Sequence, residues 1–350
     1  MGSGKAEYLA ANRRKVVFIL AFVAMAAASF FLTLGFGTFD ISLADAVRAF
    51  FDCLIGNPVD PDARTYVWDV RAPRALGAVI AGAALSVAGA VMQNDFRNPL
   101  ADPYTMGISS GAFLGAVLSI VLGISVVPFV PDSLATVANA FIFSLFPIAI
   151  ILAVSRFKKL TPVALILVGI AVMYLFSSVC QVIMVTSPSE SLAEAYSWRV
   201  GSFSSIRWGS LPVMLAVSIA CIAAIWLLSG RMNVMYAGDR AAQTMGEDPR
   251  RIRMITLVLA SLMTAAVVSY TGTIGFIGLV GPHVARLFVG SDNRYLIPAS
   301  AAFGAAFLLL ADTVAKVSGA NGLPVGVISS MIGGPLFMWI LIRQRRSAWL

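Results

Sequence analysis

The residues with the clearest chemical potential in this sequence flank one apolar run. Arg71 and Arg74 stand at the start of the run, and residues 97–103 follow it. The two arginines place positive charge at one face of a membrane. The later segment interrupts the backbone at the other face, because each of its two prolines removes an amide donor and disfavours helix at the residue before it. These residues could therefore bind acidic groups at one membrane face and expose unpaired backbone groups at the other.

The broken segment contains Asn98, Pro99 and Leu100. Irregular backbone near membrane depth persists only where protein or a water-filled cavity satisfies its polar groups. These residues are therefore candidates for the lining or gate of a path across the membrane. An ordinary cytoplasmic turn is the alternative, since prolines often mark such turns.

A second cluster lies in the longest segment that we assign to the cytoplasmic side, residues 230–253. Gly238 and Gly246 bracket one or two helical turns there. A short helix that lies across the ends of two spans can dock into a groove of another protein. It can then transmit a conformational change of that protein to the spans. The alternative is a positively charged loop that only satisfies topology.

A third cluster, residues 272–286, interrupts an apolar stretch with glycines and one proline, which predicts a kinked or broken span. It holds His283, the only histidine in the chain. One histidine makes a poor metal site, because ligation usually needs three or four donors, and a structural hydrogen-bonding role is favoured. The sequence also lacks a GxxxxGK[ST] phosphate loop. We therefore predict no catalytic residues, no metal site and no cofactor bound by this chain.

Composition defines the elements that must position these clusters. With 59% hydrophobic and 12% charged residues, the chain cannot build a polar exterior in water. Apolar runs long enough to cross a bilayer recur along it. We predict an all-α polytopic membrane protein, with a cytoplasmic tail (1–15) and one transmembrane domain (16–345). Its ten expected spans are 16–37, 74–93, 107–127, 134–155, 162–186, 209–229, 254–272, 275–290, 295–312 and 324–342.

The charge distribution predicts the orientation of these spans. Basic residues favour the cytoplasmic side of short loops, and most of the 25 lysines and arginines fall on one side of the expected topology. The loop on the other side, residues 38–70, holds six aspartates and two arginines. Both termini are therefore expected in the cytoplasm. The formal net charge of +8 reflects orientation and attraction to the membrane surface rather than nucleic-acid binding.

The second span carries a stripe of small residues, Ala78, Gly82, Ser86 and Ala90, at four-residue spacing. Such a stripe lets another helix approach closely. We expect this helix to lie centrally in the bundle.

Together the three clusters resemble the FecCD family of permeases, the membrane subunits of type II ATP-binding-cassette importers for ferric siderophores, haem and cobalamin. The resemblance covers residues 60–345 and implies the type II ABC importer permease fold, with ten membrane helices per subunit and a homodimer around a central pathway. The motifs that carry it are RAPR (71–74), RNPLADP (97–103), GISSGA (107–112), GS (201–202), WGSL (208–211), GFIGLV (275–280), PHVAR (282–286), AD (311–312), LPVGV (323–327) and IGGP (332–335).

The resemblance also implies partners: two cytoplasmic ATPase subunits, which would hold ATP and Mg, one periplasmic or extracellular binding protein, and the lipid bilayer. Arg71, Arg74 and Lys316 would meet acidic residues of the binding protein, with Lys316 a weaker point-charge contact than the arginine commoner there. The implied ATPase-coupling residues are Gly238, Asp239, Arg240, Ala241, Ala242, Met245 and Gly246. The implied gate comprises Asn98, Pro99 and Leu100 and a companion turn of Thr161, Pro162 and Val163.

The function implied by the resemblance is transport, not enzymatic catalysis: import of a ferric siderophore or related metal chelate across a prokaryotic cytoplasmic (inner) membrane by alternating access. Import of haem or cobalamin is the alternative. A secondary transporter without an ATPase would need acidic residues within spans, and only Asp312 lies near a span interior. A structural or receptor membrane protein would not need breaks at both faces.

Overall fold

The protein is described here by a computed structural model that covers residues 3–37, 39–157, 161–319 and 322–343. Within these ranges the chain forms helices and no β-strand. In chain order the elements are α1 (Ser3–Gly35), α2 (Leu43–Ile55), α3 (Pro61–Ala63), the π-helix η1 (Arg64–Arg71), α4 (Ala72–Phe96), α5 (Ile108–Ile120), α6 (Asp132–Phe157), α7 (Pro162–Val185), α8 (Ser189–Val200), α9 (Leu211–Leu227), α10 (Ser229–Tyr236), α11 (Asp239–Thr244), α12 (Pro249–Thr271), α13 (Ile277–Val289), α14 (Asn293–Val317) and α15 (Val325–Arg343).

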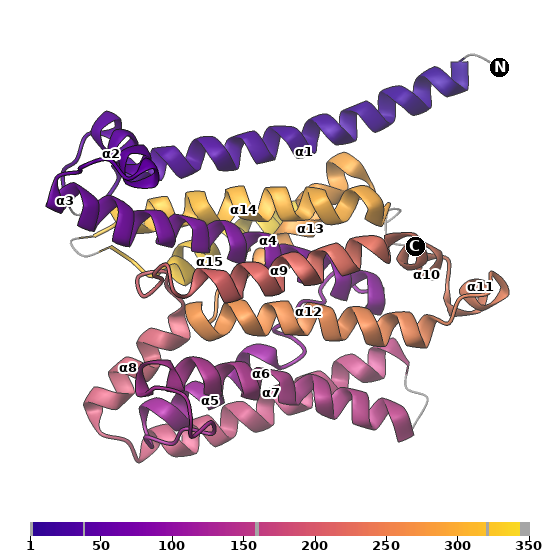
Figure 1. Ribbon diagram of the computed structural model, residues 1–350. Coiled ribbons are helices and arrows are strands. Elements are labelled where there is room, and N and C mark those ends of the chain that lie inside the picture. Colours follow the sequence, from indigo (N-terminus) through magenta and orange to yellow (C-terminus); the bar gives the residue numbers. More distant parts are fainter. Residues whose placement is uncertain (1–2, 38, 158–160, 320–321, 344–350) are drawn as a thin grey trace.

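The long helices run side by side in one bundle, as Figure 1 shows. Helices α2 and α3 gather at one end of this bundle, and α10 and α11 gather at the other. We call these the α2 end and the α11 end. Helix α1 begins and helix α15 ends at the α11 end, so the two termini lie on the same side of the bundle.

Each of the ten expected spans coincides with a helix. Seven helices are long and apolar enough to cross a membrane, and α9 and α10 together form a further crossing, bent by 56°. Helices α5 and α13 are apolar but only 13 residues long. The expected span 107–127 was therefore too long: its helix ends at Ile120, and Gly123, with a φ of 63°, turns the chain away.

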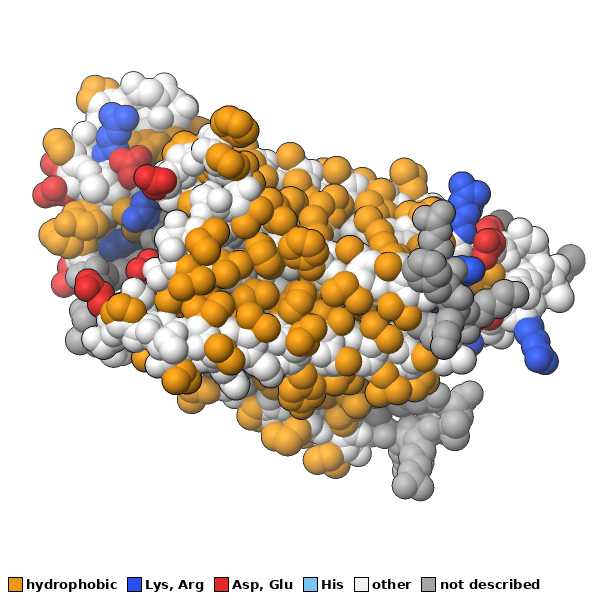
Figure 2. All heavy atoms as spheres, turned by 90° about the horizontal axis from the view of Figure 1, so that it is seen from below, with side chains coloured by type: hydrophobic (Ala, Val, Ile, Leu, Met, Phe, Trp, Pro, Cys, Tyr) orange, Lys and Arg blue, Asp and Glu red, His pale blue; other side chains and the backbone are white. Residues whose placement is uncertain are grey.

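The surface of the bundle matches a membrane environment. Figure 2 shows hydrophobic side chains covering the middle of one face, with charged side chains gathered towards the two ends. Exposed apolar residues such as Leu167, Val182 and Leu227 are more than half accessible. A water-soluble protein rarely exposes so large a continuous apolar area, whereas acyl chains accept it.

Helix α4 lies at the centre of the bundle, as its small residues predicted. It is buried along nearly its whole length and packs against α14, α12 and α13. A Cβ added at Gly82 would lie 2.2 Å from the carbonyl oxygen of Gly304, and one at Gly89 would lie 1.8 Å from that of Gly278. Both distances are far below contact, so the small residues allow backbones to touch.

The segments outside the expected spans are more ordered than a tail and a loop. Helix α1 already begins at Ser3, so the described part of the expected tail continues the first span as helix. The acidic segment 38–70 contains α2, α3 and η1, with Ser42 and Asp60 as side-chain caps of α2 and α3. Its Trp68 packs on Trp208, with ring centroids 4.7 Å apart. This packing anchors the segment to the bundle.

Candidate functional site

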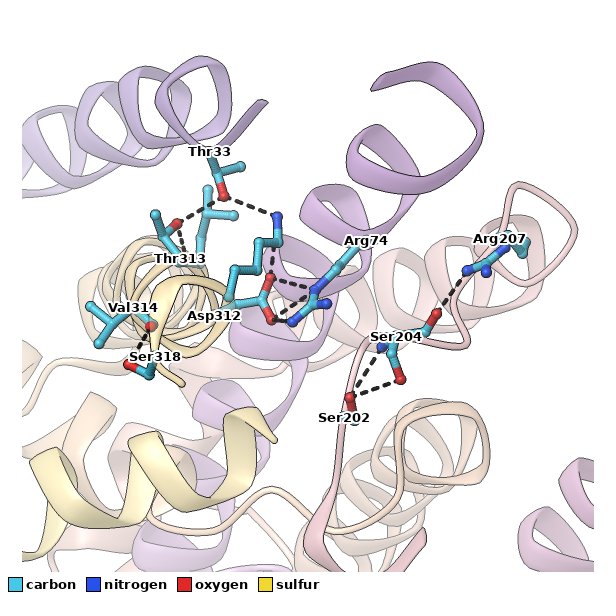
Figure 3. Close-up of polar contacts among 11 residues, drawn as sticks. Thr33, Arg74, Ser202, Ser204, Arg207, Asp312, Thr313, Val314 and Ser318 are labelled. Carbon is cyan, nitrogen blue, oxygen red and sulfur yellow. Dashed lines mark hydrogen bonds and ion pairs between the residues drawn. The ribbon is translucent and has the colours of Figure 1, made fainter. Parts of the chain in front are cut away.

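Three cationic side chains that the sequence singled out come together at the α2 end. Arg71, Arg74 and Lys316 border one hollow of about 290 Å³. Arg74 grips the fully buried Asp312 with two nitrogens: Nη2 donates to Oδ1 at 2.8 Å and Nε donates to Oδ2 at 3.0 Å. Figure 3 shows the two groups pointing towards one another. Arg74 and Asp312 thus join α4 to α14.

Lys316 shares the same carboxylate. Its Nζ lies 3.5 Å from Asp312 Oδ2 and donates to the hydroxyl of Thr33 at 3.1 Å. Only 5% of the Lys316 side chain is exposed, against 16% for Arg74. The cluster therefore carries two cations on one acid, and Arg74 is the more accessible of the two.

Arg71 has a different environment from its neighbours. Its guanidinium is buried and donates to the backbone carbonyl of Leu34 at 2.8 Å and to that of Phe39 at 2.5 Å. A Cβ on Gly37 would lie 2.7 Å from Arg71 Nη2. In this structure Arg71 fastens the end of α1 to the start of the acidic segment.

Replacing Arg71 by methionine is expected to destabilise the protein by about 1–3 kcal/mol, because the buried carbonyl of Leu34 and the part-buried carbonyl of Phe39 lose their donor. Thermal unfolding of the detergent-solubilised protein would measure this as a lower midpoint. The matched control is Arg207→Met, since Arg207 is exposed and donates only to carbonyls of its own turn, those of Ser204 and Ile206. Equal midpoints for the two variants would contradict the bracing role.

Sequence reasoning did not recover the organisation at the α11 end. Asp239, the first residue of α11, accepts hydrogen bonds from Arg97, just after α4, and from Nη2 of Arg253 on α12 at 3.0 Å. Arg253 is buried, and its Nε donates to the carbonyl of Asp95 at 2.8 Å. One carboxylate thus ties α11 to both α4 and α12.

The remaining residues expected in the coupling segment form a short projecting helix. Gly238 and Gly246 flank α11 with φ angles of 112° and 84°, values that suit glycine. Ala242 is fully buried against the bundle, whereas Met245 is 67% exposed. Figure 1 shows α11 standing out from the rest of the molecule. The exposed residues Arg240 and Met245 are available for contact with another protein.

The two turns expected to form a gate also lie at this end. The side-chain oxygen of Asn98 accepts from the amide of Leu100 at 2.9 Å, and Leu100 is half exposed. Thr161 caps α7 by accepting from the amide of Ala164 at 3.3 Å, and Val163 is exposed. Residues 158–160, next to this second turn, lie outside the described ranges.

The two broken spans meet inside the bundle. The chain between α4 and α5 and the chain between α12 and α13 are both irregular, and the hydroxyl of Tyr104 accepts from the amide of Ile274 at 2.9 Å. Thirteen residues of helix rise only about 20 Å, against about 30 Å for the hydrocarbon core. Helices α5 and α13 therefore start inside the membrane. His283 on α13 is buried, and its Nδ1 lies 2.7 Å from the carbonyl oxygen of Leu279, which agrees with a structural role.

This architecture, a bundle of apolar helices with two half-length helices that start at meeting backbone breaks, is that of a membrane permease, a transport component rather than an enzyme. The particular family is clear from sequence. The chain belongs to the FecCD transport family, whose model matches residues 24–343.

Individual relatives cover most of the chain. It is 39% identical over 287 residues to the hemin transport system permease protein of Yersinia pestis, covering 81% of this chain and 85% of that one. It is 40% identical over 284 residues to the cobalamin import system permease protein of Halobacterium salinarum, covering 81% and 75%. A solved structure of a metal-chelate type ABC transporter in an inward-facing conformation superposes with a TM-score of 0.82 at 28% identity, covering 93% of this chain and 99% of that chain.

Proposed function

We propose that this chain is the permease subunit of an ATP-driven importer that moves a ferric siderophore or related metal chelate into the cytoplasm. Two copies would form the pathway, two ATPase subunits would bind at the α11 end, and one binding protein would deliver cargo at the α2 end. The observation that carries the proposal is the meeting of two broken spans through Tyr104 and Ile274, because irregular backbone inside a membrane belongs beside a pathway.

The proposed orientation places the α11 end in the cytoplasm of a prokaryotic cell, with the protein in its inner membrane. Basic side chains such as Arg97, Arg250 and Arg253 lie at that end, and the acidic segment 38–70 lies at the other. This asymmetry follows the preference of basic residues for the cytoplasmic side. Both termini would then be cytoplasmic.

The site residues take their roles from this orientation. The cationic hollow of Arg71, Arg74 and Lys316 would attract acidic side chains of the binding protein, and Arg74 would make the direct contact. The projecting face of α11 would enter a groove of the ATPase. The Asn98 and Thr161 turns would open and close the cytoplasmic end of the pathway.

The cargo class is supported by the relatives, whose names include hemin, cobalamin and metal-chelate transport. Import of haem or cobalamin is the second candidate and shares every step of the proposed cycle. A secondary transporter would instead need an acidic residue exposed to a pathway, and Asp95, Asp102 and Asp312 are all buried.

The test is uptake by the reconstituted complex. The chain, its ATPase and its binding protein are placed in liposomes, and accumulation of a radioactive iron chelate is measured with ATP and with a non-hydrolysable analogue. We expect uptake only with ATP, the ATPase and the binding protein together. Uptake driven by an ion gradient without the ATPase would overturn the proposal.

A further inference from the structure

The protein surface is hollowed where the two broken spans meet. The hollow measures about 370 Å³ and is bordered by the starts of α5 and α15, the end of α8 and the break before α13. Four hydroxyl side chains and one guanidinium line it, and none of its lining residues is acidic. The polar lining residues are Tyr104, Ser109, Arg199, Thr273 and Ser330. Irregular backbone inside a membrane does not face lipid, so this hollow faces water or a second subunit.

Arg199 is held in place at its backbone. The hydroxyl of Thr273 donates to the Arg199 carbonyl at 2.5 Å, and the amide of Gly326 donates to the carbonyl of Gly201 at 3.2 Å. A Cβ on Gly326 would lie 1.8 Å from the carbonyl oxygen of Val200, so α15 touches the end of α8 directly. The end of α8 is therefore wedged between α15 and the break before α13.

The charged end of Arg199 remains available. Its guanidinium carbon lies 5.2 Å from the centroid of the Phe113 ring, and the side chain is exposed. Across the ranges that the structure describes, no carboxylate lies within ion-pair distance of it. Arg71, Arg74, Arg97 and Arg253, by contrast, all bind carboxylates or backbone carbonyls.

The position of Arg199 makes this availability informative. Ser197 and Ser202, on either side of Arg199 in the sequence, line the hollow of Arg71, Arg74 and Lys316, so Arg199 lies near the α2 end of the bundle. There its guanidinium borders the break before α13 and is accessible to an anion that arrives from the α2 end. Helices α5, α13 and α15 also begin at this hollow, and their positive N-terminal ends add to the attraction for anions.

We propose that this hollow is one half of a pathway site for an anionic, carboxylate-bearing metal chelate, with Arg199 as the residue that contacts the carboxylate. The inference rests on the proposed function and narrows its cargo. Guanidinium and carboxylate pair through two parallel hydrogen bonds, and the hydroxyl of Ser109 offers a further donor. Two copies in a homodimer would present two arginines to one cargo molecule.

The experiment compares six chelates in the reconstituted importer. Haem, mesohaem and ferric citrate carry free carboxylates, whereas ferrioxamine, ferrichrome and cobalamin do not. Initial uptake rates below saturation are measured for the wild type, Arg199→Leu, Arg199→Lys and the control Arg207→Leu. We expect uptake of at least one carboxylate-bearing chelate, an approximately tenfold loss in Arg199→Leu, partial retention in Arg199→Lys and no loss in Arg207→Leu.

The outcomes separate the two proposals. Uptake of only the chelates without carboxylates, or equal rates in wild type and Arg199→Leu, would overturn the role of Arg199 and leave the importer assignment standing. Absence of ATP-dependent uptake for all six would overturn the proposed function, and the inference with it. Matching thermal midpoints for wild type and Arg199→Leu would show that a lost rate is not lost folding.

Discussion

Replacing Asp239 by asparagine is expected to lower ATP-driven uptake by about 30-fold or more, while the complex still hydrolyses ATP. The carboxylate of Asp239 is the contact through which α11 holds Arg97 after α4 and Arg253 on α12. Hydrogen bonds to charged groups contribute about 1.5–3 kcal/mol, and 2 kcal/mol corresponds to about 30-fold. Motion of α11 would then no longer reach the Asn98 turn.

The asparagine variant isolates this connection because it keeps the size of the side chain. Its amide oxygen can still accept hydrogen bonds, but it carries no negative charge to hold two guanidinium groups. Arg253 would keep its bond to the Asp95 carbonyl, so we expect α12 to stay in place. Chelate uptake and ATP hydrolysis are measured in the same liposomes, and the transport ratio is the amount of chelate taken up per ATP hydrolysed.

Asp248→Asn is the matched control in the same segment. Asp248 caps α12 by accepting from the amides of Arg250 and Arg251, and asparagine caps helices equally well. This variant should transport like the wild type. Equal transport ratios for the Asp239 and Asp248 variants would rule out a coupling role for Asp239.

The sequence predicted the helices well because hydropathy is a local property. Ten apolar runs became ten apolar helices, and the glycine and proline clusters at 97–103 and 272–286 mark where two of them are interrupted. The half-length of α5 was missed because its apolar run continues past the turn at Gly123. Apolar composition does not distinguish a helix from the apolar loop that follows it.

The partners of the charged residues could not be predicted from local pattern. Arg74 and Asp312 are 238 positions apart, and Arg97 and Asp239 are 142 apart. From the sequence, Arg97 and Arg253 served only to indicate which loops are cytoplasmic, although in the folded protein both bind Asp239. Arg71 and Arg74 looked equivalent, yet packing turns one to backbone carbonyls and the other to a carboxylate. Such choices depend on which helices become neighbours.

Replacing Arg74 by glutamine is expected to weaken binding of the partner binding protein by about 30-fold, if the α2 end is its docking surface. The variant removes one positive charge from a hollow that holds three cations and one carboxylate. Charges at an interface act mainly on association rate, so the loss should appear in the on-rate. Surface plasmon resonance with the purified complex would measure it.

Neutral glutamine is a sharper choice than charge reversal. Glutamate at position 74 would face the fully buried Asp312 and leave two carboxylates with only Lys316 between them, which would disturb folding. Glutamine can still donate to Asp312, and Lys316 keeps the ion pair. Arg207→Gln is the control, because Arg207 lies at the same end but binds only backbone carbonyls of its own turn, apart from the Asp312 cluster in Figure 3.

Salt dependence gives this prediction a second readout. Screening weakens long-range attraction between charges, so wild-type association should slow steeply between low and physiological ionic strength. In Arg74→Gln the association rate should depend less on ionic strength, whereas in Arg207→Gln this dependence should stay close to that of the wild type. Unchanged affinity and slope in Arg74→Gln would mean that Arg74, like Arg71, only braces the bundle, and that the binding protein docks elsewhere on the α2 end.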